Sequence, residues 1–285
     1  MLLYKKFFLI CILFGMQDFL YSHAQVDKYI IGAHPLRGFF AAIFHAIAGV
    51  MWAEENNKVP VIYWDHNSPY YQKTGYFGNS NAWEYYFEPI SSASYLSGDE
   101  VNNLYLGHST DPYVYDIFEH YLPSGINDVK LRVHKHFTKY LRIKPRIKKK
   151  VYDFYSTHIK GKKTIGIHLR GTDKHIEVKP VDPKLIFDQA NKYNCDQYFI
   201  ATDEEKLLEQ AKKFLNKKVI YYPSLRSYDG FAIHYNDNFN KARLGEEVLI
   251  EAQLLSKCSK FIHTMSAVSI AVLVFNPYIE NIFFK

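Results

Sequence analysis

Apolar and polar positions alternate along this chain in a way that predicts strands and helices in turn. Residues 28–31 read as a strand, and apolar residues then recur at helical spacing from Phe39 to Glu55. A second strand is predicted over residues 59–64. A strand, a helix and a strand within about 40 residues form a βαβ unit, which implies a parallel sheet.

The second half of the chain repeats this alternation. Strands are predicted over residues 163–169, 197–202, 218–222 and 260–263, and helices over 183–193, 204–215, 244–256 and 266–275. Asp203 is placed to cap the helix that follows it. This order predicts a doubly wound domain, which binds its ligand at the carboxyl ends of its strands.

The segment between the two alternating regions has a different character. Residues 65–123 are rich in Tyr, Asn, Ser and Gly, which predicts loops and short helices, and residues 128–158 read as helices interrupted at Pro145. Aromatic residues of this region offer a flat surface for a sugar, with core packing as the alternative. They are Trp64, Trp83, Tyr85 and Tyr86.

The N-terminal 25 residues have the pattern of a targeting segment. Lys5 and Lys6 precede the apolar stretch 7–16, and a small-x-small site follows at 22–24. The stretch is short for a bilayer span, which needs about 20 residues. We favour a cleaved signal peptide over a membrane anchor, and a true start at Met16 is a third alternative.

Composition narrows the class of protein. The 285 residues are 48% hydrophobic and 22% charged, which is typical of globular domains rather than of disordered or multi-span membrane proteins. The net charge of +6 suits a phosphate-bearing ligand without identifying one. The basic run 144–150 reads as a solvated helix face, and since no recognition motif accompanies it, we predict no nucleic-acid binding. Cys195 and Cys258 do not make a disulfide framework.

Polar side chains gather where three predicted strands end. They are His168, Arg170, Thr172, Asp173 and Lys174 after the first strand, Thr202 and Asp203 after the second, and His263, Thr264 and Ser266 after the last. An arginine at such an edge can engage two phosphate oxygens at once, and a helix N-terminus attracts anions. We therefore expect Arg170 and Lys174 to bind phosphate beside Ser266, and Glu251 or Asp203 to accept from guanine.

Purely structural roles for the same residues stay open beside these ligand-binding roles. Arg170 and Asp173 fit a turn closed by its own ion pair, Asp203 fits a helix cap, and His263 fits a packed strand-end histidine. The sequence has no P-loop, no nucleophile elbow and no zinc-protease motif. It also has no Asp-x-Asp pair to hold a metal beside a nucleotide sugar, which favours metal-independent chemistry with cationic side chains in the metal's place.

The segment HLRGTDK, residues 168–174, resembles the H-x-R-[RG]-T-D-K motif of the α1,6-fucosyltransferase group. That group includes the rhizobial nodulation fucosyltransferases and is related to the protein O-fucosyltransferases. ATDE at 201–204 and the segment 245–269 are similar to two further family motifs. In the N-terminal half, Gly38-Phe39 and residues 81–86 resemble segments of bacterial relatives.

The resemblance implies a GT-B-type α/β fold, with two Rossmann-like domains, parallel sheets and a cleft between them. It implies an inverting transfer from GDP-fucose, without a metal or other cofactor, to a glycan or other sugar acceptor. We expect an acceptor-side domain over residues 26–158 and a nucleotide-sugar-binding domain over 159–285. The implied donor-binding residues, besides Arg170 at the β-phosphate, are His168, Thr172, Asp173, Lys174, Asp203, Glu251, Thr264 and Ser266.

The chain departs from the family at two positions. The fucosyltransferases of N-glycan cores carry a second arginine where Gly171 stands. Their proposed catalytic carboxylate has a counterpart in Glu177, at a spacing one residue shorter. Arg170 and Glu177 are therefore the catalytic candidates, with Glu177 as the base.

Two rival functions stay open. One is transfer from another nucleotide sugar, because an arginine that grips phosphate does not identify the sugar. The other is carbohydrate binding by a secreted protein that has lost catalysis. The leader predicts the secretory pathway or membrane association, and a start at Met16 predicts the cytoplasm.

Overall fold

The structure is a computed structural model of the chain, and it describes residues 27–33, 35, 37–101, 128–171, 181–231, 233, 236 and 238–284. The predicted leader lies outside these residues, and so does the segment 172–180. No helix of the described part has the length and apolar character that a membrane crossing requires.

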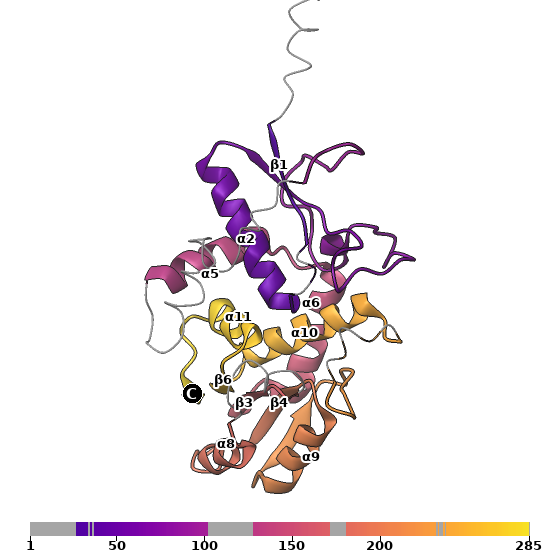
Figure 1. Cartoon of the computed structure of the whole chain (residues 1–285). Helices are drawn as coiled ribbons and strands as arrows, with labels where there is room; N and C mark the ends of the chain where they lie inside the picture. The colour runs from indigo at the N-terminus through magenta and orange to yellow at the C-terminus, as the bar shows by residue number, and fades with distance from the viewer. Residues whose placement is uncertain are drawn as a thin grey trace, which may run out of the picture.

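The first βαβ unit forms as its pattern predicts. Strands β1 (Lys28–Ile31) and β2 (Val59–Ile62) pair in parallel. Helix α2 (Phe39–Glu55) connects them, and most of its residues are buried because its sequence is apolar almost all round. Figure 1 shows this unit in indigo, with α2 lying over the helices of the second half.

Helical segments join the two sheets. A 3₁₀ turn, η1 (Ala82–Tyr85), is followed by α5 (Asp128–Tyr140) and α6 (Pro145–Phe154), which continues into the π-helical turn η2 (Tyr155–Ile159). Pro145 is at the first turn of α6, where its missing N–H costs nothing. The predicted interruption at Pro145 is confirmed.

The four aromatic residues considered as a sugar surface are core residues. Trp64, Trp83, Tyr85 and Tyr86 are each no more than 1% exposed. Their rings contact one another and their neighbours edge-on, as in Trp64 against Trp83. The sugar-surface interpretation is therefore wrong, because no face of these rings is open to a ligand.

The second half forms a five-stranded parallel sheet in the order β5-β4-β3-β6-β7. The strands are β3 (Thr164–Leu169), β4 (Gln197–Thr202), β5 (Lys218–Tyr221), β6 (Lys260–Thr264) and β7 (Asn281–Phe284). Each position of β3 and β4 is buried, as expected of central strands covered on both faces.

The strand order locates the site. From β3 the chain adds β4 and β5 on one side and then crosses to add β6 and β7 on the other. Successive connections therefore leave the carboxyl edge of the sheet in opposite directions on the two sides of β3. Ligands of open α/β sheets bind at such a switch point.

Two helix layers cover this sheet. Helices α8 (Pro183–Ala190) and α9 (Glu205–Phe214) pack on one face, and α10 (Lys241–Leu255) and α11 (Ala267–Phe275) on the other. The apolar core of the second face continues without a break into α2 and the first sheet. Figure 1 shows α10 and α11, in yellow, between the two sheets. The domain boundary at 158/159 stays a prediction.

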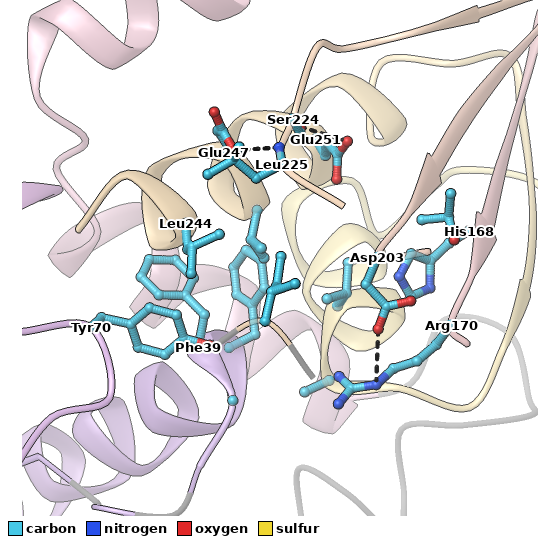
Figure 2. Close-up of a pocket in the computed structure, with 17 residues that line it drawn as sticks. Phe39, Tyr70, His168, Arg170, Asp203, Ser224, Leu225, Leu244, Glu247 and Glu251 are labelled. Atoms are coloured by element: carbon cyan, nitrogen blue, oxygen red, sulfur yellow. Dashed lines mark hydrogen bonds and ion pairs between the residues drawn. The ribbon is translucent and has the colours of Figure 1, made fainter. Parts of the chain in front are cut away.

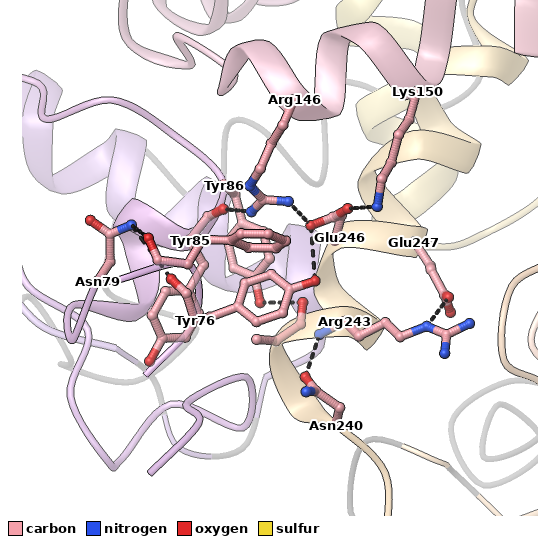
Figure 3. Close-up of polar contacts among 12 residues, drawn as sticks. Tyr76, Asn79, Tyr85, Tyr86, Arg146, Lys150, Asn240, Arg243, Glu246 and Glu247 are labelled. Atoms are coloured by element: carbon pink, nitrogen blue, oxygen red, sulfur yellow. Dashed lines mark hydrogen bonds and ion pairs between the residues drawn. The ribbon is translucent and has the colours of Figure 1, made fainter. Parts of the chain in front are cut away.

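Helix α10 contacts the N-terminal half closely. The Tyr86 hydroxyl donates to the Ala242 carbonyl at 3.0 Å, and a Cβ added at Gly245 would lie 2.5 Å from that hydroxyl oxygen. Figure 3 shows Glu246, one residue on, accepting from Arg146, from Lys150 at 2.6 Å and from the Tyr76 hydroxyl at 3.1 Å. These contacts fix α10 against α6 and the segment 76–86.

Candidate functional site

A cavity opens at the carboxyl ends of β3 and β4, between the N-terminus of α2 and the helices α10 and α11. Its walls come from both halves of the chain (Figure 2). The lining residues used below are His168, Arg170, Asp203, Ser224, Leu225, Glu247, Glu251, Ala267 and Val268. The cavity therefore lies at the switch point of the sheet.

Arg170 and Asp203 follow adjacent strands and meet at this edge. The Arg170 Nε lies 3.9 Å from the Asp203 Oδ2, and the backbone N–H of Gly171 donates to the Asp203 Oδ1 at 2.8 Å. The predicted capping role of Asp203 is wrong, because Glu204 is the N-cap of α9 and makes no side-chain cap bond. Asp203 instead holds the backbone that leaves β3, and it lines the cavity beside Arg170.

His168 lies on β3, two residues before Arg170, and is buried. Its Nδ1 is 3.1 Å from the Ser269 Oγ and 3.3 Å from the Ser266 Oγ. Burial, and then the positive charge of Arg170, lowers the pKa of His168 to about 3. The imidazole is therefore neutral near pH 7 and serves as a hydrogen-bonding group rather than as a cation.

Ser266 caps helix α11. Its Oγ accepts from the backbone N–H of Ser269 at 3.0 Å, and the hydroxyl is buried within this cap. The next two residues, Ala267 and Val268, line the cavity, so the positive end of the helix dipole faces it. Ser266 and Thr264 are not among the lining residues.

His263, near the end of β6, is a packed strand-end histidine, which confirms that alternative. It is 1% exposed, and its Nε2 lies 3.3 Å from the Asn281 Oδ1. Burial lowers its pKa to about 4, so it is neutral at neutral pH.

Glu251 occupies another wall of the cavity and is buried. Its Oε1 accepts from the Ser224 hydroxyl at 2.8 Å and lies 3.4 Å from the Arg226 Nη2. Removal from water raises the pKa of Glu251 to about 8, although Arg226 and Ser224 act in the opposite direction. In its ionised form, this buried carboxyl can accept hydrogen-bond donors from a ligand.

Glu247 lies one helical turn before Glu251 on α10. Its Oε2 accepts from the backbone N–H of Leu225 at 2.8 Å, and its Oε1 accepts from the Arg243 Nε at 2.6 Å. The segment 224–226, which follows β5, is thereby held against α10.

The structure brings together some of the predicted residues and adds others. His168, Arg170, Asp203 and Glu251 share the cavity. Thr172, Asp173, Lys174 and Glu177 lie outside the described residues and stay predictions. Sequence reasoning missed Ser224, Leu225 and Glu247, although two signals were present. The first three strands of the sheet all end at this edge, and Glu247 shares a helix face with Glu251.

Within the described ranges, no three His, Cys, Asp or Glu side chains are grouped so that they could hold a metal ion.

No protein-family model and no curated protein matches the sequence. Solved structures do match the fold. A NodZ α1,6-fucosyltransferase soaked with GDP-fucose is 15% identical, with a TM-score of 0.55 over 88% of this chain and 93% of that chain. POFUT1 in complex with GDP is 11% identical, with a TM-score of 0.50 over 92% and 99%.

A mutant of Arabidopsis thaliana FUT1 in complex with GDP is 8% identical, with a TM-score of 0.54 over 92% of this chain and 70% of that chain. At these identities the likeness establishes the fold. The chain has the GT-B α/β fold of these fucosyltransferases.

Proposed function

We propose that this protein is a glycosyltransferase that transfers fucose from GDP-fucose to a glycan or other sugar acceptor. The observation that carries the proposal is one cavity with Arg170 on one wall and Glu251 on another, at the switch point of a fucosyltransferase fold (Figure 2). One solved neighbour of this fold is in complex with GDP, and another was soaked with GDP-fucose.

In this proposal, the diphosphate lies between Arg170 and the N-terminus of α11. Negative charge grows on the diphosphate as its bond to the sugar breaks, and a fixed guanidinium stabilises that charge in the transition state. The backbone amides at Ala267 and Val268 add the positive end of a helix dipole. These groups take the place that a metal ion has in other nucleotide-sugar enzymes.

Glu251 would recognise the base of the donor nucleotide by accepting hydrogen bonds from it. The N1–H and 2-amino group of guanine are both donors, and a carboxylate accepts from both. Adenine and uracil do not present this pair of donors side by side. The nucleotide would therefore lie with its base at α10 and its diphosphate at β3.

Two finer parts of the proposal rest on the family resemblance: transfer inverts the anomeric carbon, and residues 26–158 form the acceptor side. A third rests on the sequence pattern of the N-terminal 25 residues: the leader directs the protein to the secretory pathway or to a membrane. Glu177 is the proposed base, since it follows the HLRGTDK segment closely. A Glu177→Gln enzyme is expected to lose most of its turnover, and unimpaired turnover would remove Glu177 from the mechanism.

A thermal-shift panel tests the donor. The protein is heated with GDP-fucose, GDP-mannose, UDP-GlcNAc, GDP, UDP and no ligand, and a ligand at 100 times its dissociation constant stabilises by about 2.7 kcal/mol. We expect shifts with the guanine nucleotides, the largest with GDP-fucose. Stabilisation by UDP-GlcNAc instead would support the rival donor and contradict this proposal.

Donor hydrolysis tests catalysis separately. GDP-fucose is incubated without an acceptor, and release of fucose and GDP is measured against an Arg170→Ala control. Slow hydrolysis that depends on Arg170 is expected of a transferase. Glycan binding without any hydrolysis or transfer would favour the carbohydrate-binding rival.

A further inference from the structure

The segment 224–226 is tied to α10 by two carboxylates of the same helix face. Glu247 accepts a hydrogen bond from the backbone N–H of Leu225, and Glu251 accepts one from the Ser224 hydroxyl. Both carboxylates, Ser224 and Leu225 line the cavity (Figure 2). Ser224 and Leu225 therefore form part of the cavity wall, and their contacts with α10 hold them in place.

Arg226 makes this wall rigid. Its Nη1 donates to the Ser224 carbonyl at 3.1 Å and its Nη2 to the Tyr222 carbonyl at 2.8 Å, while the Nη2 also lies 3.4 Å from Glu251. The Arg226 side chain is 4% exposed, so its position is determined by these contacts. Of the tethers that bind the segment to α10, the one from Glu247 acts on the main chain, at the Leu225 N–H.

We infer that Glu247 is a positioning residue for base specificity, which holds the segment 224–226 so that Ser224 and Arg226 orient the Glu251 carboxylate toward the base of the donor. The inference rests on the proposed function, in which Glu251 accepts from guanine. Without the Leu225 tether, the segment is expected to shift away from α10, and Glu251 then loses the fixed orientation that Ser224 and Arg226 give it. The energy of two directional hydrogen bonds falls steeply when the acceptor turns away from them.

The test compares GDP with IDP, whose base lacks the 2-amino group and so presents one donor fewer. Dissociation constants are measured calorimetrically for both nucleotides. Because a missing partner leaves a buried acceptor unpaired, we expect the wild type to prefer GDP by about tenfold or more. In Glu247→Ala, GDP is expected to bind about tenfold more weakly and IDP much less so, which brings the two constants together.

Two variants separate positioning from other roles. Glu247→Gln keeps an oxygen that can accept from Leu225 and is expected to keep most of the GDP preference. Arg243→Gln breaks the 2.6 Å contact with Glu247 but leaves the tether intact, so it is expected to behave as the wild type. With saturating GDP-fucose, the turnover of Glu247→Ala is expected to change far less than its KM.

Several outcomes would overturn the inference. Glu247→Ala with an unchanged ratio of GDP to IDP affinity would show that the tether does not set specificity. If Glu247→Ala lost equal affinity for both nucleotides and had a lowered Tm, Glu247 would have a structural role alone. If Glu247→Gln lost as much GDP affinity as Glu247→Ala, Glu247 would contact the ligand directly. A wild type that binds UDP and not GDP would instead refute the proposed function.

Discussion

Gly171 and Glu204 approach so closely that a side chain at position 171 would require its neighbours to shift. A Cβ added at Gly171 would lie 2.1 Å from the Glu204 Oε2 and 2.9 Å from the Leu207 Cδ1. A second arginine at this position, as in the core-fucosylating motif, would therefore require Glu204 and Leu207 to move.

Gly171→Ala is expected to destabilise the fold. The Glu204 carboxylate is flexible and can move aside, but Leu207 belongs to the core, so overpacking should cost about 1–3 kcal/mol. The free energy of unfolding in urea measures this cost. Gly161→Ala is an unsuitable control because of its positive φ, whereas Gly38 has nothing within 4 Å of an added Cβ and offers the matched substitution. Equal stability of Gly171→Ala and the wild type would contradict the packing argument.

Arg170→Ala is expected to lose transfer by about 10²-fold or more, because loss of one donor at a developing negative charge typically costs that much. Initial rates with GDP-fucose and a sugar acceptor measure the effect. Arg170→Lys should recover part of the activity, since an ammonium supplies charge without the two-pronged contact. A wild-type rate in Arg170→Ala would remove Arg170 from the phosphate site.

The affinity for GDP is expected to rise with pH up to about pH 8. Burial raises the pKa of Glu251 to about 8, and guanine requires the ionised form. Below that pH, the binding of GDP releases a proton from Glu251. The dissociation constant should therefore fall by up to about tenfold for each unit by which the pH rises. Calorimetry in buffers of different ionisation enthalpy counts the proton. Glu251→Gln should bind more weakly and without this dependence.

The Glu251 carboxyl also makes the free energy of unfolding depend on pH, in the direction opposite to its effect on GDP affinity. Its folded pKa lies above the unfolded value of 4.5, so its contribution is complete below that value and is lost as the pH rises through about 8. Unfolding of Glu251→Gln, measured between pH 5 and 8.5, should therefore depend on pH less than that of the wild type. Parallel curves would contradict the raised pKa.

Arg146→Ala is expected to cost about 3 kcal/mol in unfolding free energy. Glu246 is 1% exposed, and removing one partner of a buried ion leaves its charge poorly compensated, although Lys150 and Tyr76 remain. Lys149→Ala on the same helix breaks only an exposed i,i+4 pair with Asp153, which is worth about 0.3–0.5 kcal/mol. Equal effects of the two substitutions would show that the buried position of Glu246 does not matter.

Most of the helices and strands could be predicted because their apolar patterns are strong. Helix α10 begins at Lys241, three residues earlier than predicted, since Asn240 caps it by accepting from the Arg243 N–H at 2.9 Å. Strand β7 was missed because it is a short edge strand without fully buried positions, and its polar-apolar pattern is correspondingly weak.

The site was predictable only in part. The rule that ligands bind at strand ends places His168, Arg170 and Asp203 together, because parallel strands end at one edge. Ser224 and Leu225 belong to an irregular segment, and no periodic pattern indicates which side of such a segment faces a cavity. The pairing of Glu247 with Leu225 depends on tertiary packing that the sequence does not display.

The contact between Gly245 and Tyr86 has a consequence for protein engineering. A Cβ at 245 would lie 2.5 Å from the Tyr86 hydroxyl oxygen, so the surfaces of the two halves match only as a pair. A chimera would exchange one half of this chain for the corresponding half of another protein of the same fold. An exchanged N-terminal half would have to retain Tyr86 and its neighbours, since a half with another shape would not pack against α10.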